Sequence, residues 1–336
     1  MNATAPEPER PSPPHELAER VRGGSRRALA KAITLVESTL PDDVTLARAL
    51  LEELHPAAGG SLRIGLSGAP GVGKSSLVEA LGLHVVGCGH RLAVLAIDPS
   101  SAVSGGSVLG DKTRMEDLAR AETAFIRPSP SGGAPGGVAA RTPEAIEVCE
   151  AAGFDVVIVE TVGVGQADAE VAGMTDAFVL LEPPFAGDGL QAIKRGSTEL
   201  ADVVAYTKAD LDPLAAATAC ARMNDALSLL PAASSAWRPR ALAVSAITGQ
   251  GVAELWSELE HFRESLASVG ALATRRRRQS VKHMWCLIDA ELRSGLLGDG
   301  AVRERLAEIE ELVARGDVTP STAANELLVL AGRRAG

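Results

Sequence analysis

The stretch from Gly65 to Gly82, GLSGAPGVGKSSLVEALG, has residue types and spacing that can do chemistry. Gly68 to Ser75 fit G-x-x-x-x-G-K-[ST] at every fixed position, after a short apolar segment and before a helical pattern. Glycines let backbone N–H groups approach phosphate oxygens, and a helix N-terminus adds partial positive charge. The pattern predicts a phosphate-binding loop rather than a chance Gly-rich turn. The predicted loop residues are Gly68, Ala69, Pro70, Gly71, Val72, Gly73, Lys74, Ser75 and Ser76.

Charged residues near this loop predict a magnesium-dependent reaction. Lys74 is expected to reach the β- and γ-phosphates, and Ser75 to ligate Mg²⁺. Asp98 and Glu160 end two apolar segments, and Asp111 lies in a Gly-rich loop. Mg²⁺ keeps several waters, so some of these carboxylates would act through water. We predict Lys74, Asp98 and Glu160 as catalytic residues, and all three carboxylates with Ser75 as the metal site, although Asp98 and Asp111 could instead cap helices or turns.

Two further motifs indicate which nucleotide binds. TKAD, Thr207 to Asp210, follows an apolar segment and is similar to the N-K-x-D guanine motif, with Thr in place of Asn. The Asp210 carboxylate can accept from guanine N1–H and the 2-amino group, whereas adenine has neither donor; Lys208 would lie over the base. VSAITGQG then supplies a second base loop with Ser245, Ala246 and Ile247. Each motif alone is weak, and TKAD alone could be a helix start, but their order along the chain predicts GTP rather than ATP.

The residue that follows Gly163 bears on the rate of hydrolysis. Small signalling GTPases place a water-orienting Gln directly after the equivalent glycine. Here that position is Val164, which cannot orient water by hydrogen bonding. Gln166 comes two residues later, although the loop could fold it inward. We therefore expect slow hydrolysis by the isolated protein and completion of the site by a partner or a second subunit.

The elements that would position these residues follow an alternating strand and helix pattern. Continuous apolar segments separated by helical patterns indicate a parallel sheet covered on both faces. The predicted fold class is α/β, a P-loop NTPase with a mostly parallel central sheet flanked by helices. We expect Pro- and Gly-rich loops at 128–137 and 183–189, and strands at 63–68, 91–98, 154–161, 177–184, 202–210 and 240–249.

The two ends of the chain have different patterns. We expect a disordered tail at 1–14, a helical extension at 15–60, the GTPase domain at 61–268 and a helical region at 269–336. Ser25 is a candidate cap for a helix with Leu29, Ile33 and Val36 on one face. In the C-terminal region, the basic run 275–278 is interpreted as a solvated helix start, with an acidic partner surface or nucleic acid as alternatives.

Composition excludes several other classes of function. The net charge of −10 disfavours binding to nucleic acid or to anionic membranes. Four scattered cysteines without C-x-x-C fit a reducing compartment. The N-terminus, MNATAPEPERPSPP, does not have the pattern of a signal peptide, and no apolar run approaches the ~18–20 residues of a membrane span. We expect a cytoplasmic protein.

These motifs together resemble the MeaB/MMAA/ArgK GTPases, G-protein chaperones of adenosylcobalamin-dependent acyl-CoA mutases. The resemblance extends from Gly23 to the C-terminus and includes GAPGVGKSSL, AIDPSSAVSGGSVLGDKTRM, FIRPSPSGGAPGGVA, DVVIVETVGVGQADAEVAGMTD, GDGLQAIKRG, YTKAD and VSAITGQGVAELW. It implies GTP or GDP and Mg²⁺ as ligands, and a role in loading, gating or protecting the cofactor of methylmalonyl-CoA mutase. It also implies a homodimer built through the C-terminal helices.

The resemblance assigns roles to individual residues. Lys74, Ser75, Asp98, Asp111 and Glu160 fall on the family's phosphate and magnesium positions, and Lys208, Asp210 and Ser245 to Ile247 on its two base loops. The segment Pro183 to Lys194 matches one that signals to the mutase in the family. Thr207 occurs in other members, so it is compatible with GTP.

Two alternative functions stay open at the level of sequence. A metal-insertion GTPase of the sister group would need clustered Cys or His, and we find no such cluster in the sequence. A transport-system kinase would need a phosphate acceptor and access to the cell envelope, and the sequence indicates neither.

Overall fold

The computed structural model describes residues 13–98, 115–130, 138–161, 166–184, 196–229 and 236–332. The chain divides into two compact units, Met1–Gln279 and Ser280–Gly336. The boundary falls within one helix, α14 (Ala271–Gly298). The domain boundaries expected from the sequence stay a prediction.

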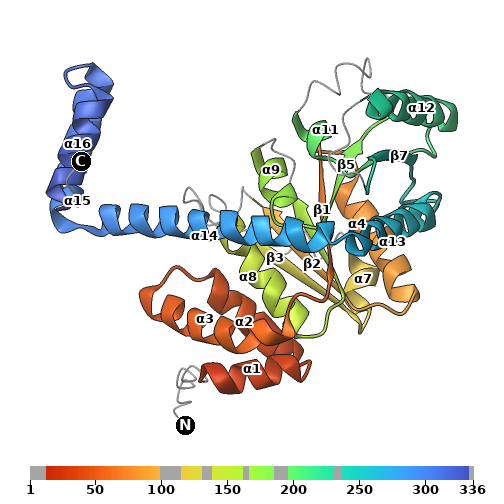
Figure 1. The fold of residues 1–336 in the computed structure, drawn as a ribbon, viewed down its shortest axis with the longest axis horizontal. Coiled ribbons are helices and arrows are strands. Elements are labelled where there is room, and N and C mark those ends of the chain that lie inside the picture. Colours follow the sequence, from red (N-terminus) through yellow and green to blue (C-terminus); the bar gives the residue numbers. More distant parts are fainter. Residues whose placement is uncertain are drawn as a thin grey trace, which may run out of the picture. The chain divides into compact units, whose positions relative to one another are not determined.

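The first unit contains the parallel sheet that the apolar segments predicted (Figure 1). Within the described residues the sheet has seven strands, all paired in parallel, in the order β3-β2-β4-β1-β5-β6-β7. Their carboxyl ends therefore meet at one edge. The strands are β1 (Leu62–Gly68), β2 (Leu92–Asp98), β3 (Ala124–Pro130), β4 (Val156–Thr161), β5 (Ala177–Glu182), β6 (Val203–Tyr206) and β7 (Arg240–Ala243).

The strand β3 was not predicted from the sequence. Residues 128–130 were expected to begin a Pro- and Gly-rich loop, but they pair with β2, with Ala96 opposite Pro128. β3 lies at the edge of the sheet, where proline is tolerated because one side of the strand needs no ladder partner. Pro128 and Pro130 thus mark an edge strand here.

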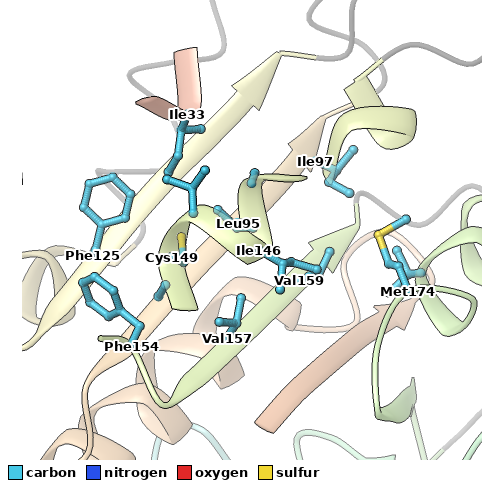
Figure 2. Close-up of a cluster of buried hydrophobic side chains, with 14 of the residues drawn as sticks. Ile33, Leu95, Ile97, Phe125, Ile146, Cys149, Phe154, Val157, Val159 and Met174 are labelled. Carbon is cyan, nitrogen blue, oxygen red and sulfur yellow. The ribbon is translucent and has the colours of Figure 1, made fainter. Parts of the chain in front are cut away.

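Helices cover both faces of the sheet, as predicted. Val157 and Val159 of β4 belong to one buried cluster, and Val156 and Ile158 to the other. The first cluster includes the packing of Phe125, Phe154 and Ile146 shown in Figure 2. Its helices are α1 (Pro14–Arg22), α2 (Arg26–Glu37), α3 (Pro41–Leu54), α8 (Val138–Ala151), α9 (Gln166–Ala172) and α12 (Pro213–Leu229). The opposite face is covered by α4 (Lys74–Gly87), α7 (Glu116–Arg120) and α13 (Val252–Ser268).

The N-terminal helices pack against the first face, next to α8 (Figure 1). Ser25 caps α2 as predicted, because its Oγ accepts from the Ala28 N–H at 3.3 Å. Leu29, Ile33 and Val36 are all buried. The short 3₁₀ turn η1 (His55–Ala57) then leads toward β1.

The second unit contains the rest of α14, α15 (Gly300–Arg315) and α16 (Pro320–Leu330). Asp299 and Thr319 cap α15 and α16, and Arg305 joins the two helices through Glu326 at 2.9 Å. No helix among the described residues is long and apolar enough to cross a membrane.

The first turns of α14 correct the interpretation of the basic run. Arg276 pairs with Asp176, which is fully buried, at 2.5 Å, and also donates to the Gly59 and Ser61 carbonyls. Arg275 pairs with the buried Asp202 at 3.0 Å. A solvated helix start is therefore wrong for Arg275 and Arg276, which bind carboxylates at the amino ends of β5 and β6.

We expect Arg276→Ala to lower the free energy of unfolding by about 3–5 kcal/mol, because it leaves the buried Asp176 carboxylate without its cation. Urea unfolding followed by circular dichroism measures this change. Arg277→Ala is the matched control, since Arg277 is exposed and its side chain contacts Thr274 one turn away. A loss no larger in Arg276→Ala than in Arg277→Ala would contradict the assignment.

Candidate nucleotide-binding site

The predicted phosphate loop joins the central strand β1 to α4 (Figure 1). β1 ends at Gly68, where an added Cβ would lie 2.5 Å from the backbone oxygen of Leu181 in β5. Gly73, at the start of α4, has φ 102°, a left-handed conformation that favours glycine. The chain can therefore turn directly from strand to helix, with its backbone open to a bound anion.

Lys74 is buried at the start of α4 and holds its ammonium against the loop. Its Nζ donates to the carbonyls of Gly68 at 2.7 Å and Ala69 at 3.1 Å. Burial lowers the pKa of Lys74, and the negative charges of Glu160 and Asp168 oppose that shift. The arrangement keeps the Lys74 ammonium at the loop, where it can donate to phosphate oxygens.

Ser75 and Glu160 lie together at the carboxyl edge of the sheet. The Ser75 Oγ donates to Glu160 Oε1 at 2.9 Å. Glu160 lies near the end of β4, between Leu66 of β1 and Ala96 of β2 in the strand register, and is buried. A hydroxyl and a carboxylate are oxygen donors of the kind that Mg²⁺ prefers, so these residues fit the predicted metal.

The other predicted metal ligands are described only in part. The backbone of Asp98 ends β2, at the same edge of the sheet as Glu160. The Asp98 side chain and all of Asp111 lie outside the described residues. Val164 also lies outside them, and Gln166 is described only as the backbone that begins α9.

The TKAD segment, which follows β6, is bound directly to the phosphate loop. The Thr207 Oγ1 donates to the Val72 carbonyl at 2.7 Å, and the Lys208 Nζ donates to the Gly71 carbonyl at 2.8 Å. Lys208 has φ 57°, the one left-handed non-glycine conformation among the described residues. This role of Thr207 was missed from the sequence, although its hydroxyl in place of an Asn amide was a visible signal.

The second base loop orients the carboxylate of Asp210. The Ser245 Oγ donates to Asp210 Oδ1 at 2.6 Å and accepts from the Thr248 N–H at 3.2 Å. Ser245 is fully buried, whereas Ile247 is 85% exposed beside it. The two predicted base loops are therefore in contact with each other, and the exposed Ile247 follows two residues after the serine that binds Asp210.

The structure thus brings most of the predicted site residues together. Lys74, Ser75 and Glu160 gather on the sheet side of the phosphate loop, while Thr207 and Lys208 contact its Gly71–Val72 segment. Ser76 is exposed in the first turn of α4. The arrangement can hold a phosphate chain and a base with one connected set of side chains.

Comparison with known proteins confirms the family resemblance over most of the chain. A family model described as methylmalonyl Co-A mutase-associated GTPase MeaB matches residues 29–300. A putative GTPase of Caulobacter vibrioides is 48% identical over 316 residues, which cover 94% of this chain and 97% of that protein. GTPase ArgK of Escherichia coli is 47% identical over 268 residues, which cover 80% of this chain and 81% of that protein.

Two further matches come from a mouse protein and a solved structure. The mitochondrial methylmalonic aciduria type A homolog of Mus musculus is 44% identical over 316 residues, covering 91% of this chain and 76% of that protein. A crystal structure described as a LAO/AO transport system kinase superposes with a TM-score of 0.74 at 35% identity, covering 97% of this chain and all of that chain. Matches of this extent show that the chain belongs to the MeaB family of methylmalonyl-CoA mutase-associated GTPases, and that its chemistry is the hydrolysis of GTP.

Proposed function

We propose that this GTPase is a chaperone that gates loading of the adenosylcobalamin cofactor into methylmalonyl-CoA mutase and protects the loaded cofactor. The match of residues 29–300 to a family described by its association with that mutase carries the proposal. The name of the mouse relative refers to methylmalonic aciduria, which agrees with it. The chain has no D-x-H-x-x-G cobalamin motif, so the cofactor would belong to the partner. The cytoplasmic location stays a prediction.

We propose the following roles for the site residues. Lys74 neutralises charge on the β- and γ-phosphates, and the loop N–H groups orient them. Ser75 and Glu160 would hold Mg²⁺, with Asp98 and Asp111 as further ligands or water contacts; the ion would neutralise charge that develops on the phosphates. Glu160 and Asp98, as the catalytic carboxylates, would keep the metal waters in place.

Recognition of the base is proposed for the two loops that meet at Asp210. Ser245 turns the Asp210 carboxylate, which would accept from the two donors on the guanine edge. The Lys208 stem and Ile247 would contact the faces of the ring, and the Ala246 backbone its carbonyl oxygen. A base without those donors would leave the carboxylate unpaired.

We expect Asp210→Asn to weaken GTP binding by about 100-fold and to strengthen binding of xanthosine triphosphate. The amide presents a donor where guanine also has donors, whereas xanthine has an oxygen at that position. Competition against a fluorescent nucleotide measures both affinities. Asp212→Asn is the matched control, because Asp212 accepts from the Ala215 N–H at the start of α12. If the Asp210→Asn protein prefers GTP over xanthosine triphosphate as strongly as the wild type does, Asp210 does not recognise the base.

Slow intrinsic hydrolysis is proposed because Val164 cannot orient a water by hydrogen bonding. The partner would then complete the site or order the segments around it. The γ-phosphate would act on the segments 98–114, 163–166 and 183–194, as in other GTPase switches. Apart from Asp98, Gln166 and residues 183–184, these segments lie outside the described residues. The last of these would carry the signal to the mutase.

A homodimer is proposed from an apolar stripe on the part of α14 that lies in the second unit. Val281, Met284, Trp285, Ile288 and Leu292 recur at three- and four-residue spacing, and all are exposed. Trp285 is 57% exposed, which is unusual for so large an apolar side chain. The same stripe on a second copy would cover it. Sedimentation equilibrium that gives the mass of one chain at micromolar concentration would contradict the dimer.

We expect methylmalonyl-CoA mutase to raise the GTP turnover of the full chain by about tenfold or more, because the partner would complete a site that has no water-orienting side chain at Val164. Phosphate release is measured with and without the mutase, and with Lys74→Ala as the inactive control. The absence of stimulation by any adenosylcobalamin-dependent acyl-CoA mutase would contradict the chaperone role.

The fate of the γ-phosphate tests one of the two alternative functions. The transport-system kinase is suggested by the similar crystal structure, which is described as a kinase of that class. Transfer of the γ-phosphate to a protein rather than to water would support it. For the metal-insertion alternative, the described segments contain no group of three or more His, Cys, Asp or Glu side chains that could hold a metal ion.

A further inference from the structure

Asp168, a buried carboxylate on α9, connects the strand that leads into the phosphate loop with a helix that the nucleotide motifs do not include. It is 6% exposed and lies in the first turn of the helix. One of its oxygens accepts from the Ser67 hydroxyl, and the other accepts from the Ser197 hydroxyl at 2.6 Å. A carboxylate only accepts hydrogen bonds, so both hydroxyls donate to it.

The Ser67 side of this network adjoins the proposed nucleotide site. Ser67 directly precedes Gly68, the first residue of the phosphate loop, and its Oγ accepts from the Thr161 Oγ1 at 3.0 Å. Thr161 directly follows Glu160. The hydroxyls of Thr161 and Ser67 therefore form a buried chain that begins beside Glu160 and ends on Asp168.

The Ser197 side reaches α11 (Gly196–Leu200), a short helix that leads into β6. A cavity of about 630 Å³ lies between the two sides; Gly68, Ala69 and Pro70 line it with Asp168, Ser197 and Leu200. The cavity lies between α11 and the phosphate loop. The hydrogen bond from Ser197 to Asp168 connects α11 to α9. Ser197 is half-buried, so removing its hydroxyl changes little packing.

The other end of α9 is held in place more firmly. A Cβ added to Gly65 of β1 would lie 2.5 Å from Val171 and 2.7 Å from Thr175, so the helix packs closely on the strand. Gln279 donates to the carbonyls of Thr175 at 2.7 Å and Ala172 at 3.4 Å. A change at the nucleotide can therefore move the Asp168 end of α9 more easily than its C-terminal end.

We propose that Asp168 is a positioning residue that couples the phosphate loop to α11. Ser67 and Thr161 link the carboxylate to the strand ends that carry Gly68 and Glu160, and Ser197 links it to α11. The bound nucleotide then sets how tightly α11 is held. The proposal rests on GTP binding alone and does not depend on the identity of the partner.

Hydrogen exchange of the full chain, followed by mass spectrometry, tests this coupling with GDP–Mg²⁺ and with a non-hydrolysable GTP analogue–Mg²⁺. In the wild type we expect peptides that cover α9 and α11 to exchange at different rates with the two nucleotides. Ser197→Ala is expected to raise exchange of α11 about tenfold, the effect of one lost charge-assisted hydrogen bond, and to abolish the dependence of α11 on the nucleotide. The α9 peptides should keep their dependence.

Three further variants separate coupling from stability. Ser197→Thr keeps a hydroxyl and is expected to restore the nucleotide dependence of α11. Glu199→Ala, at an exposed site on the same helix, should behave as the wild type. Asp168→Ala should remove the nucleotide dependence of exchange from both α9 and α11. If the Asp168→Ala protein does not fold, Ser197→Ala alone provides the test.

Two results would overturn the proposal: a wild-type α11 that exchanges equally with both nucleotides, or a Ser197→Ala protein that keeps the full difference. No mutase is present in this experiment. A negative outcome therefore leaves the test of mutase stimulation unaffected.

Discussion

The direct contact between the TKAD segment and the phosphate loop is the constraint on which the site depends. A nucleotide spans only a limited range of distances between its base and its phosphates, so two loops that recognise it must keep a defined relative position. The bonds from Thr207 to the Val72 carbonyl and from Lys208 to the Gly71 carbonyl set that position. The parallel order of β1, β5 and β6 makes the contact possible, because it brings the ends of these strands to the same edge.

The amino ends and the carboxyl ends of the strands in the sheet are stabilised in different ways. At the amino edge, Arg275 and Arg276 of α14 bind the buried carboxylates of Asp202 and Asp176, and ion pairs of this kind are costly to break. At the carboxyl edge, the contacts are hydroxyl–carboxylate bonds, from Ser75 to Glu160 and from Ser67 to Asp168. Such bonds can exchange partners when a ligand brings new oxygen atoms. The amino ends of the strands are thus firmly held, whereas the contacts at their carboxyl ends can adjust to a ligand.

Local sequence patterns predicted the parts of the structure that depend on local rules. The phosphate loop, the apolar central strands and the Ser25 cap each need only neighbouring residues, and the structure agrees with them. The strand β3 was missed because its prolines are acceptable only at a sheet edge, a property of the whole topology. Asp168 was missed because its partners, Ser67 and Ser197, are 101 and 29 residues away. Pairings over such distances follow from the fold and leave no periodic signal in the sequence.

The most direct test is the affinity of Thr207→Val for GTP and GDP, measured by displacement of a fluorescent nucleotide. Valine keeps the shape of the side chain but leaves the buried Val72 carbonyl without its donor, which costs about 1–3 kcal/mol. If the two loops act as one unit, both nucleotides should bind about 10-fold more weakly, and Thr207→Ser should bind as the wild type does. Wild-type affinity for both nucleotides in a folded Thr207→Val protein would contradict this account.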